Sequence, residues 1–198
     1  RCEGMKLTDA ALAQVIVATY GCKPETAARH AGPMNDAMQA AAVTTAKRAA
    51  HWLAQIGHES GRLRWMRELW GPTPAQRRYE PVTTLSARLG NSRPGDGRRF
   101  MGRGLIQVTG RYNYRAATMR LKKLVGASVP DFEASPVLLE SLDWAAMSAA
   151  DYWAHRKLNV FADADDLYTL TRRINGGTNG LADRQALLAR ATTVLQGV

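Results

Sequence analysis

The feature that most constrains the fold is a change in residue composition and periodicity in the middle of the chain. Ten glycines and prolines punctuate residues 71–104, where apolar residues show little helical periodicity. Because these residue types favour turns, a long loop region with at most a short irregular hairpin is expected there. Loops of this length inside a compact domain are usually functional. Helical patterning resumes on both sides, so the sequence predicts a mainly α fold with one loop-rich insert at about 71–104.

Helices are predicted where apolar residues recur at helical spacing and helix-end signals occur. Thr8 is the expected N-cap of the first helix, and Gly21 its end. Gly32 and Pro33 are expected to end a short second helix, and Pro136 to open a later one. The predicted helices span 8–20, 25–30, 37–58, 112–124, 136–153, 167–174 and 181–195.

The length of the chain limits the number of domains, and its net charge limits the classes of binding partner. A chain of 198 residues fits one compact domain, expected over 5–198, with residues 1–4 ahead of Met5 interpreted as a cloning remnant. The 27 Lys and Arg against 17 Asp and Glu give a net charge of +10. Such a charge indicates affinity for a polyanion: nucleic acid, an acidic membrane face or a cell-wall polymer.

Neither export signals nor metal-binding motifs are found in the sequence. The longest apolar stretch, residues 10–20, is shorter than the about 20 residues of a membrane span, and no signal peptide precedes it. Synthesis in the cytoplasm is therefore expected. The two cysteines, Cys2 and Cys22, have no C-x-x-C spacing, and the four histidines form no H-E-x-x-H. A metal site and a disulfide-stapled mini-domain are not predicted.

A candidate proton donor closes the long Ala-rich helix, in the segment GHESG at 57–61. A carboxylate at a helix C-terminus opposes the helix dipole, and apolar neighbours would desolvate it. Both effects favour the protonated form, so Glu59 is suited to donate a proton. The alternative is a solvated surface glutamate.

A second carboxylate, Glu68, follows nine residues later. On one continuous helix the two would lie on opposite faces, about 13 Å apart along the axis. If Gly61 ends the helix, the chain can fold back and bring both into one cleft, at the roughly 6.5–9.5 Å that admits a water in inverting glycosidases. The alternative for Glu68 is an ion pair with Arg64 or Arg67, and Glu80 is a third candidate carboxylate.

Two further segments concentrate polar side chains. Residues 100–114 combine glycines that allow close backbone approach with several hydrogen-bonding groups, an arrangement typical of a site for a polar polymer. The segment lacks the glycine spacing of a phosphate-binding loop. Residues 172–180 contain Asn-Gly and Gly-Gly turn signals and, taken alone, indicate a helix–helix connection.

Together and in this order, four motifs resemble glycoside hydrolase family 19, and most closely its endolysin branch from phages and prophages of Gram-negative bacteria. They are HESG at 58–61, LGNSRPGDGRRF at 89–100, GRGLIQVTGR at 102–111 and INGG at 174–177. The resemblance covers about residues 50–190. It implies a lysozyme-like, mostly helical fold with two lobes around a sugar-binding cleft.

The resemblance also implies roles for individual residues. Glu59 matches the general acid, and Thr109 the hydroxyl residue that helps hold the attacking water. Glu68 matches the general base of bacterial members, whereas plant-type members place the base farther along, nearer Glu80; Glu68 is the favoured assignment. The predicted substrate-binding residues are His58, Glu80, Arg103, Gln107, Tyr112, Asn113, Asn175 and Arg184.

The function implied is cleavage of β-1,4 bonds in peptidoglycan glycan strands, with inversion and without a metal or organic cofactor. The protein is expected to be a monomeric endolysin with no separate cell-wall-binding domain and no nucleic-acid partner, whose basic surface is attracted to the wall and the anionic outer membrane. It would leave the host cytoplasm through a holin-like pore and act in the periplasm. Chitin is the alternative substrate, and a basic nucleic-acid-binding protein is the alternative of another class.

Overall fold

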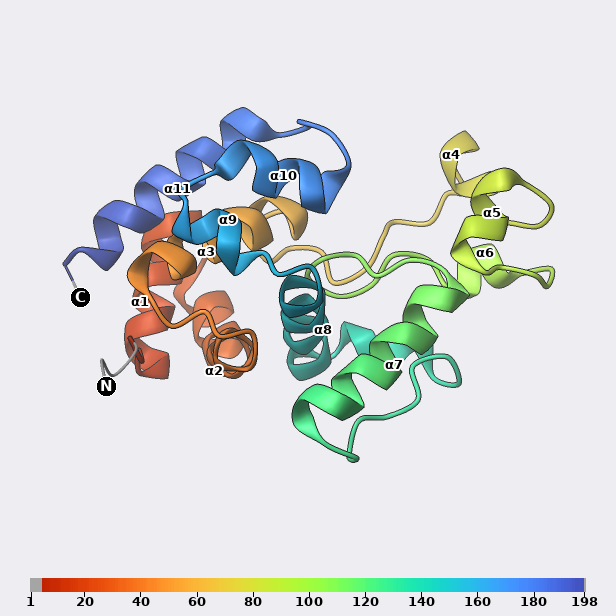
Figure 1. The fold of residues 1–198 in the computed structure, drawn as a ribbon, viewed down its shortest axis with the longest axis horizontal. Helices are drawn as coiled ribbons and strands as arrows, with labels where there is room; N and C mark the ends of the chain where they lie inside the picture. The colour runs from red at the N-terminus through yellow and green to blue at the C-terminus, as the bar shows by residue number, and fades with distance from the viewer. Residues whose placement is uncertain (1–4, 198) are drawn as a thin grey trace.

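The structure is a computed structural model that describes residues 5–197 (Figure 1). Residues 1–4, the expected cloning remnant with Cys2, lie outside the described residues, as does residue 198. The described chain is mainly helical, as predicted, and its only β pairing consists of the isolated bridges Arg67–Arg103 and Arg103–Val108. Its helices are α1 (Asp9–Tyr20), α2 (Pro24–Ala40), α3 (Ala46–Glu59), α4 (Pro74–Arg77), α5 (Thr84–Leu89), α6 (Asp96–Arg99), α7 (Arg111–Val125), the 3-10 helix η1 (Pro136–Glu140), α8 (Leu142–His155), α9 (Asn159–Asp163), α10 (Leu167–Asn175) and α11 (Leu181–Leu195).

Several predicted helices are confirmed, with their end signals. The Thr8 side chain accepts a hydrogen bond from the amide of Ala11 at 3.1 Å, and Gly21 ends α1 in the left-handed conformation at φ 64°. Helices α7, α10 and α11 lie within a residue of their predicted limits. These helices have clear apolar stripes and local stop signals, so sequence pattern alone was sufficient.

The predicted end of the second helix at Gly32 and Pro33 is wrong. Helix α2 passes through both residues and continues to Ala40. An interior proline removes one backbone hydrogen bond and normally kinks a helix. Here the following turns carry the buried side chains of Met34 and Met38, so tertiary packing outweighs the local cost.

The predicted long helix at 37–58 is also wrong, because residues 41–45 divide it. Ala42 takes a positive φ of 54°, and Thr45 starts α3 by accepting a hydrogen bond from the amide of Arg48 at 3.2 Å. Asn159 donates to the carbonyl of Ala41 at 2.8 Å, which stabilises the break from a distant part of the chain.

The predicted helix at 136–153 is two elements. A 3-10 helix at Pro136–Glu140 ends at Ser141, and α8 begins at the next residue. The short helix α9 was not predicted. The insert at 71–104 is loop-rich as predicted, but it contains three short helices, α4 to α6, and two of them are held by capping boxes, Thr73 with Gln76 and Thr83 with Ser86.

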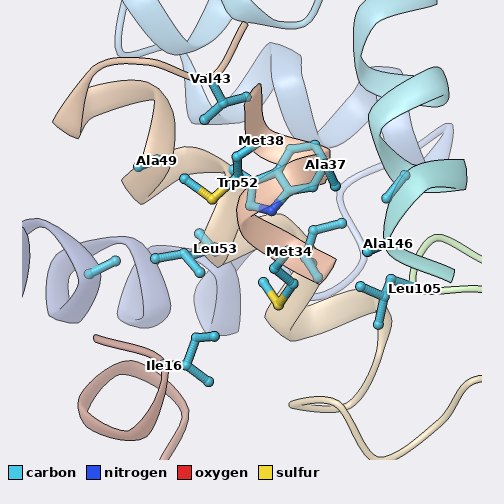
Figure 2. Packing of buried hydrophobic residues seen from close by; sticks show 14 of the residues in the cluster. Ile16, Met34, Ala37, Met38, Val43, Ala49, Trp52, Leu53, Leu105 and Ala146 are labelled. Carbon is cyan, nitrogen blue, oxygen red and sulfur yellow. The ribbon is translucent and has the colours of Figure 1, made fainter. Parts of the chain in front are cut away.

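Two hydrophobic cores define the two lobes. The larger core joins α1, α2, α3, α8 and α11, and in it Trp52 meets Trp153 edge to face at 5.3 Å. Figure 2 shows Trp52 of α3 beside Met34 and Met38 of α2. The smaller core, centred on α7, contains Phe100, Tyr114, Leu121, Val129, Phe132 and Leu139. Figure 1 shows α4, α5 and α6 at the end of the molecule far from both termini.

Candidate active site

Glu59 lies where the larger lobe ends and the chain leaves toward the smaller one. It is the last residue of α3, and three consecutive residues, Gly61, Arg62 and Leu63, take left-handed conformations with φ between 57° and 67°. A helix cannot continue through such residues, so the predicted break at Gly61 is confirmed. The Glu59 side chain keeps 20% of its surface exposed.

Arg184 of α11 fixes the position of Glu59. Its guanidinium has no exposed surface; Nη2 donates to Oε1 of Glu59 at 2.5 Å, and Nη1 donates to Oε1 of Gln55, one turn earlier on α3. A side chain with no exposed surface cannot contact a bound glycan without rearrangement. The structure therefore favours Arg184 as a positioning residue for Glu59, in place of the predicted contact with substrate.

His58 takes part in a second contact between α3 and α11. Its Nδ1 lies 2.7 Å from Oδ2 of Asp183, whose other oxygen accepts from Arg62 at 2.6 Å. Burial alone would raise the pKa of Asp183, but the hydrogen bonds from His58 and Arg62 hold it below its usual value. A Cβ on Gly180 would lie 2.0 Å from the His58 ring, so α11 begins in direct contact with this histidine. His58 thus joins two helices, and its predicted substrate contact stays a prediction.

Glu68 is held in place by neutral donors of the smaller lobe. Its Oε1 accepts from Nε2 of Gln76 at 2.9 Å and from the hydroxyl of Tyr79 at 3.4 Å, and its Oε2 accepts from the amide of Gly102 at 3.1 Å. Among the described residues, neither arginine of the predicted alternative ion pair contacts this carboxylate. The structure gives Glu68 a fixed orientation without a paired cation.

Gly102 brings the predicted catalytic residues of this lobe together. Its amide and carbonyl both bond to Glu68, the carbonyl by accepting from the Glu68 amide at 2.8 Å. A Cβ on Gly102 would lie 2.7 Å from Oε1 of Gln107 and 3.2 Å from Oγ1 of Thr109. Glu68, Gln107 and Thr109 therefore converge on one glycine, as close backbone approach requires.

A cavity of about 350 Å³ lies beside this cluster. One wall comes from the polar segment around the start of α7 and includes Gln107, Thr109, Tyr112 and Asn113; Tyr112 is 63% exposed. The other wall is α8. The lining residues on that helix are Ser148, Asp151, Tyr152 and His155, followed by Arg156.

Tyr152 connects the α8 wall to α10. Burial raises the pKa of Tyr152, Arg156 opposes this rise, and the charge of Glu59 adds to it. The hydroxyl of Tyr152 donates to the carbonyls of Arg173 and Ile174 at 3.1 and 3.2 Å, which ties α8 to α10. The cavity thus lies beside the Glu68–Gly102 cluster through Gln107 and Thr109, and its α8 wall is bonded to α10 through Tyr152.

Glu80, the alternative candidate for the general base, forms hydrogen bonds within the insert. Its Oε2 accepts from the amide of Gly95 at 2.8 Å and its Oε1 from the amide of Arg98 at 3.3 Å. A Cβ on Gly97 would lie 2.6 Å from Oε1, so the carboxylate packs against the start of α6. These contacts favour a role for Glu80 in holding the insert and leave Glu68 as the carboxylate beside Gln107 and Thr109.

The two remaining predicted residues lie in different settings. Arg103 is buried; its Nε donates to Glu140 at 2.7 Å and its Nη1 to the Tyr114 hydroxyl at 3.0 Å. Its guanidinium is thereby engaged inside the smaller lobe, so the structure favours a positioning role over the predicted substrate contact. Asn175 ends α10, is exposed, and donates to the carbonyl of Asn179 at 3.1 Å.

The α8 wall was not predicted from the sequence. Positions 148, 151, 152 and 155 recur at helical spacing and carry polar or aromatic side chains on an otherwise Ala-rich helix, so a signal was present. Within residues 5–197, no group of three or more His, Cys, Asp or Glu is placed to hold a metal ion. None of the helices in that range is long and apolar enough to span a membrane.

Sequence comparison identifies the family of this two-lobed helical protein. No family model matches the chain. A glycosyl hydrolase family 19 domain-containing protein of Haemophilus influenzae is 34% identical over 168 residues, covering 73% of this chain and 78% of that protein. The chain belongs to glycoside hydrolase family 19. An endochitinase of Arabidopsis thaliana is 34% identical over 136 residues, which are 68% of this chain and 41% of the plant protein.

Solved structures agree on the fold. Chitinase C from Streptomyces griseus superposes with a TM-score of 0.68 and 20% identity, covering 96% of this chain and 78% of that one. A bacterial family 19 chitinase gives a TM-score of 0.65 at 18% identity, covering 93% of this chain and 95% of that one. The predicted lysozyme-like architecture is confirmed, and the protein is a glycoside hydrolase.

Proposed function

We propose that this hydrolase cleaves the β-1,4 bonds of bacterial peptidoglycan with inversion of the anomeric centre. The observation that carries the proposal is the cavity lined by Gln107 and Thr109, whose side chains converge with Glu68 on Gly102, together with Glu59 at the point where the chain leaves the larger lobe. An inverting hydrolase uses two carboxyl groups, one that protonates the leaving oxygen and one that activates water, and Glu59 and Glu68 are each held in a fixed position by hydrogen bonds.

In this mechanism Glu59 donates the proton. Arg184 contacts only Oε1 among the described bonds, so Oε2 is the oxygen left to carry a proton toward the glycosidic oxygen. The buried guanidinium holds the carboxyl at a fixed place, which lowers the entropic cost of reaching the reactive geometry.

Glu68 and Thr109 act on the water. The Thr109 hydroxyl donates to the carbonyl of Gln107 at 2.9 Å, so its oxygen lone pairs face a water as acceptors. Glu68, oriented by Gln76 and by the Gly102 amide, removes the second proton as the water attacks the sugar from the face opposite the leaving group.

Charge supports peptidoglycan as the substrate. Peptidoglycan carries peptide carboxylates, whereas chitin is neutral and gives no use to a net charge of +10. Chitin is the second candidate, because the related proteins are named as chitinases and both polymers contain N-acetylglucosamine. In the proposed role as an endolysin, the protein reaches the wall from the cytoplasm through a holin-like pore and its basic surface holds it to the anionic envelope.

The test compares purified peptidoglycan sacculi with chitin. Mass spectrometry of the released sugars identifies the substrate and the bond that is cleaved. NMR of the freshly formed products determines their anomeric configuration. We expect muropeptide products with inverted configuration. Glu59→Gln and Glu68→Gln should each lower turnover by on the order of 10²-fold or more, since each removes a proton-transfer group. Glu25→Gln, an exposed glutamate in the first turn of α2, is the matched control. Cleavage of chitin alone, or normal turnover by folded Glu59→Gln, would contradict the proposal.

A further inference from the structure

A second hollow of about 250 Å³ lies next to the cavity beside the candidate catalytic residues. Arg120, Asp151 and His155 line both, so the two hollows are neighbours along α7 and α8. The name basic groove denotes the charged part of these two hollows. Its charged and titratable residues are Arg120, Lys123, Asp151, His155 and Arg156.

The basic groove carries more positive charge than its own carboxylate can neutralise. Asp151 is 5% exposed and is bonded on both oxygens by Arg120, at 2.8 Å from Nε and 2.7 Å from Nη2, so these two charges cancel. Arg156 has neutral partners: the carbonyl of Arg173 at 3.3 Å and the ring of Tyr152 at 4.6 Å. Among the described residues, neither Lys123 nor Arg156 forms an ion pair.

Exposed cationic side chains without carboxylate partners, placed in a hollow, attract an anion. The neighbouring residues of the hollow indicate the chemical class of that anion. The same cavity that Arg156 and His155 line is lined by Gln107, Tyr112 and Asn113, the predicted glycan-binding residues. A ligand that fills both parts must therefore combine a sugar with an anionic branch. A lipid phosphate satisfies only the second requirement.

We propose that the basic groove binds the carboxylates of the peptide stem attached to the glycan strand, an inference that rests on the proposed function. Arg120 lies eight residues after Tyr112 on α7, about 12 Å along the helix axis. An extended peptide covers about 3.3–3.6 Å per residue, so three or four stem residues span that distance. Lys123 and Arg156 then act as specificity-determining residues, which select strands that bear stems.

The experiment uses the double variant Lys123→Gln/Arg156→Gln. Both positions are exposed, so the substitutions remove charge with little effect on the core. The charge-matched control is Lys122→Gln/Lys157→Gln, which changes two exposed lysines next to the groove that do not line it. Substrates are peptidoglycan sacculi and the same sacculi after an amidase has removed the stems. Unfolding midpoints confirm that each variant is folded.

We expect wild-type kcat/KM to be higher on stem-bearing strands than on stripped strands. The groove variant should lose roughly 10- to 100-fold in kcat/KM on stem-bearing strands, mostly through KM, because it loses two charged hydrogen bonds. Its loss on stripped strands should be several-fold smaller, and the control should stay near wild type on both.

The outcomes separate this inference from the proposed function. If wild type cleaves both peptidoglycan substrates equally well, the proposed function stands and the groove inference is wrong. Equal losses by the groove variant on both substrates, or equal losses by the control, would also overturn the inference. If binding to phosphatidylglycerol vesicles is lost while the stem preference is unchanged, the groove is a membrane site. Cleavage of chitin alone would overturn both.

Discussion

Gly102→Ala tests the convergence of the candidate catalytic residues at one backbone position. The glycine does not have a positive φ, so alanine brings no backbone strain, and the whole effect comes from the added methyl group. That Cβ would meet Oε1 of Gln107 at 2.7 Å and Oγ1 of Thr109 at 3.2 Å. The Gln107 amide must move by about 0.7 Å to reach ordinary contact, and Thr109 by a few tenths of an ångström.

The substitution is therefore expected to lower kcat more than the stability of the fold. Misplacement of about 1 Å costs up to roughly 100-fold in rate, so we expect kcat to fall by roughly 10- to 100-fold. Overpacking costs about 1–3 kcal/mol, less than the about 5–15 kcal/mol of a typical domain, so the variant should remain folded. Initial rates of reducing-end release at saturating glycan, together with urea unfolding, measure the two effects separately.

Gly197→Ala is the matched control, because its Cβ would make only ordinary contact at 3.6 Å with the carbonyl of Val194, away from the site. It should keep the wild-type rate. A folded Gly102→Ala protein with kcat within about twofold of wild type would refute the reasoning, since Gln107 and Thr109 would then tolerate displacement without loss of function.

Three further predictions concern stability and charge. The pKa of Glu133 lies at about 2, above all because Arg115 hydrogen-bonds to it, so its stabilising effect is present above the ordinary value of 4.5 and is lost as pH falls toward 2. Glu133→Gln should remove about 1–2 kcal/mol of stability at pH 7 and flatten its decline between about pH 5 and 2, measured by urea unfolding; solvent exposure of Arg115 limits the figure. Arg184→Met should cost about 3–5 kcal/mol because it leaves Glu59 without its cation, whereas the exposed Arg190→Met should cost little; a loss below about 1 kcal/mol would contradict the contact. Activity on sacculi should decline as salt rises above about 0.15 M, where the Debye length is about 8 Å, and a flat salt profile would argue against electrostatic attraction to the wall.

The accuracy of the sequence predictions depends on whether the deciding interaction is local. The ends of α1 at Thr8 and Gly21 are local, and both were predicted correctly. The break between α2 and α3 has a local part, the Thr45 cap and the bond from Arg48 to the carbonyl of Ala42, and a distant part, the bond from Asn159 to the carbonyl of Ala41. The β-branched residues 43–45 were a local signal for the break, which the high helix propensity of the surrounding alanines obscured.

The same distinction applies to the candidate site. Motif resemblance singled out Glu59, Glu68 and Thr109, but the environment of Glu59 depends on Arg184, which lies 125 residues later in the chain. The sequence argument that apolar neighbours favour a protonated Glu59 left out this buried cation. Likewise Glu80 and Glu68 were not separable by sequence, because their hydrogen bonds come from backbone amides of the folded insert and of Gly102.

The two candidate catalytic carboxylates belong to different lobes, although only eight residues separate them. Glu59 is fixed to the larger lobe by Arg184 of α11, and Glu68 is fixed to the smaller lobe by Gly102 and Gln76. The separation of the carboxylates is therefore set by how the lobes pack, and not by the connecting segment. Val108 and Met147 pack against both cores, and α8 forms one wall of the cavity. Because α8 both joins the lobes and lines the cavity, a substrate bound in the cavity would contact the helix against which the two lobes pack.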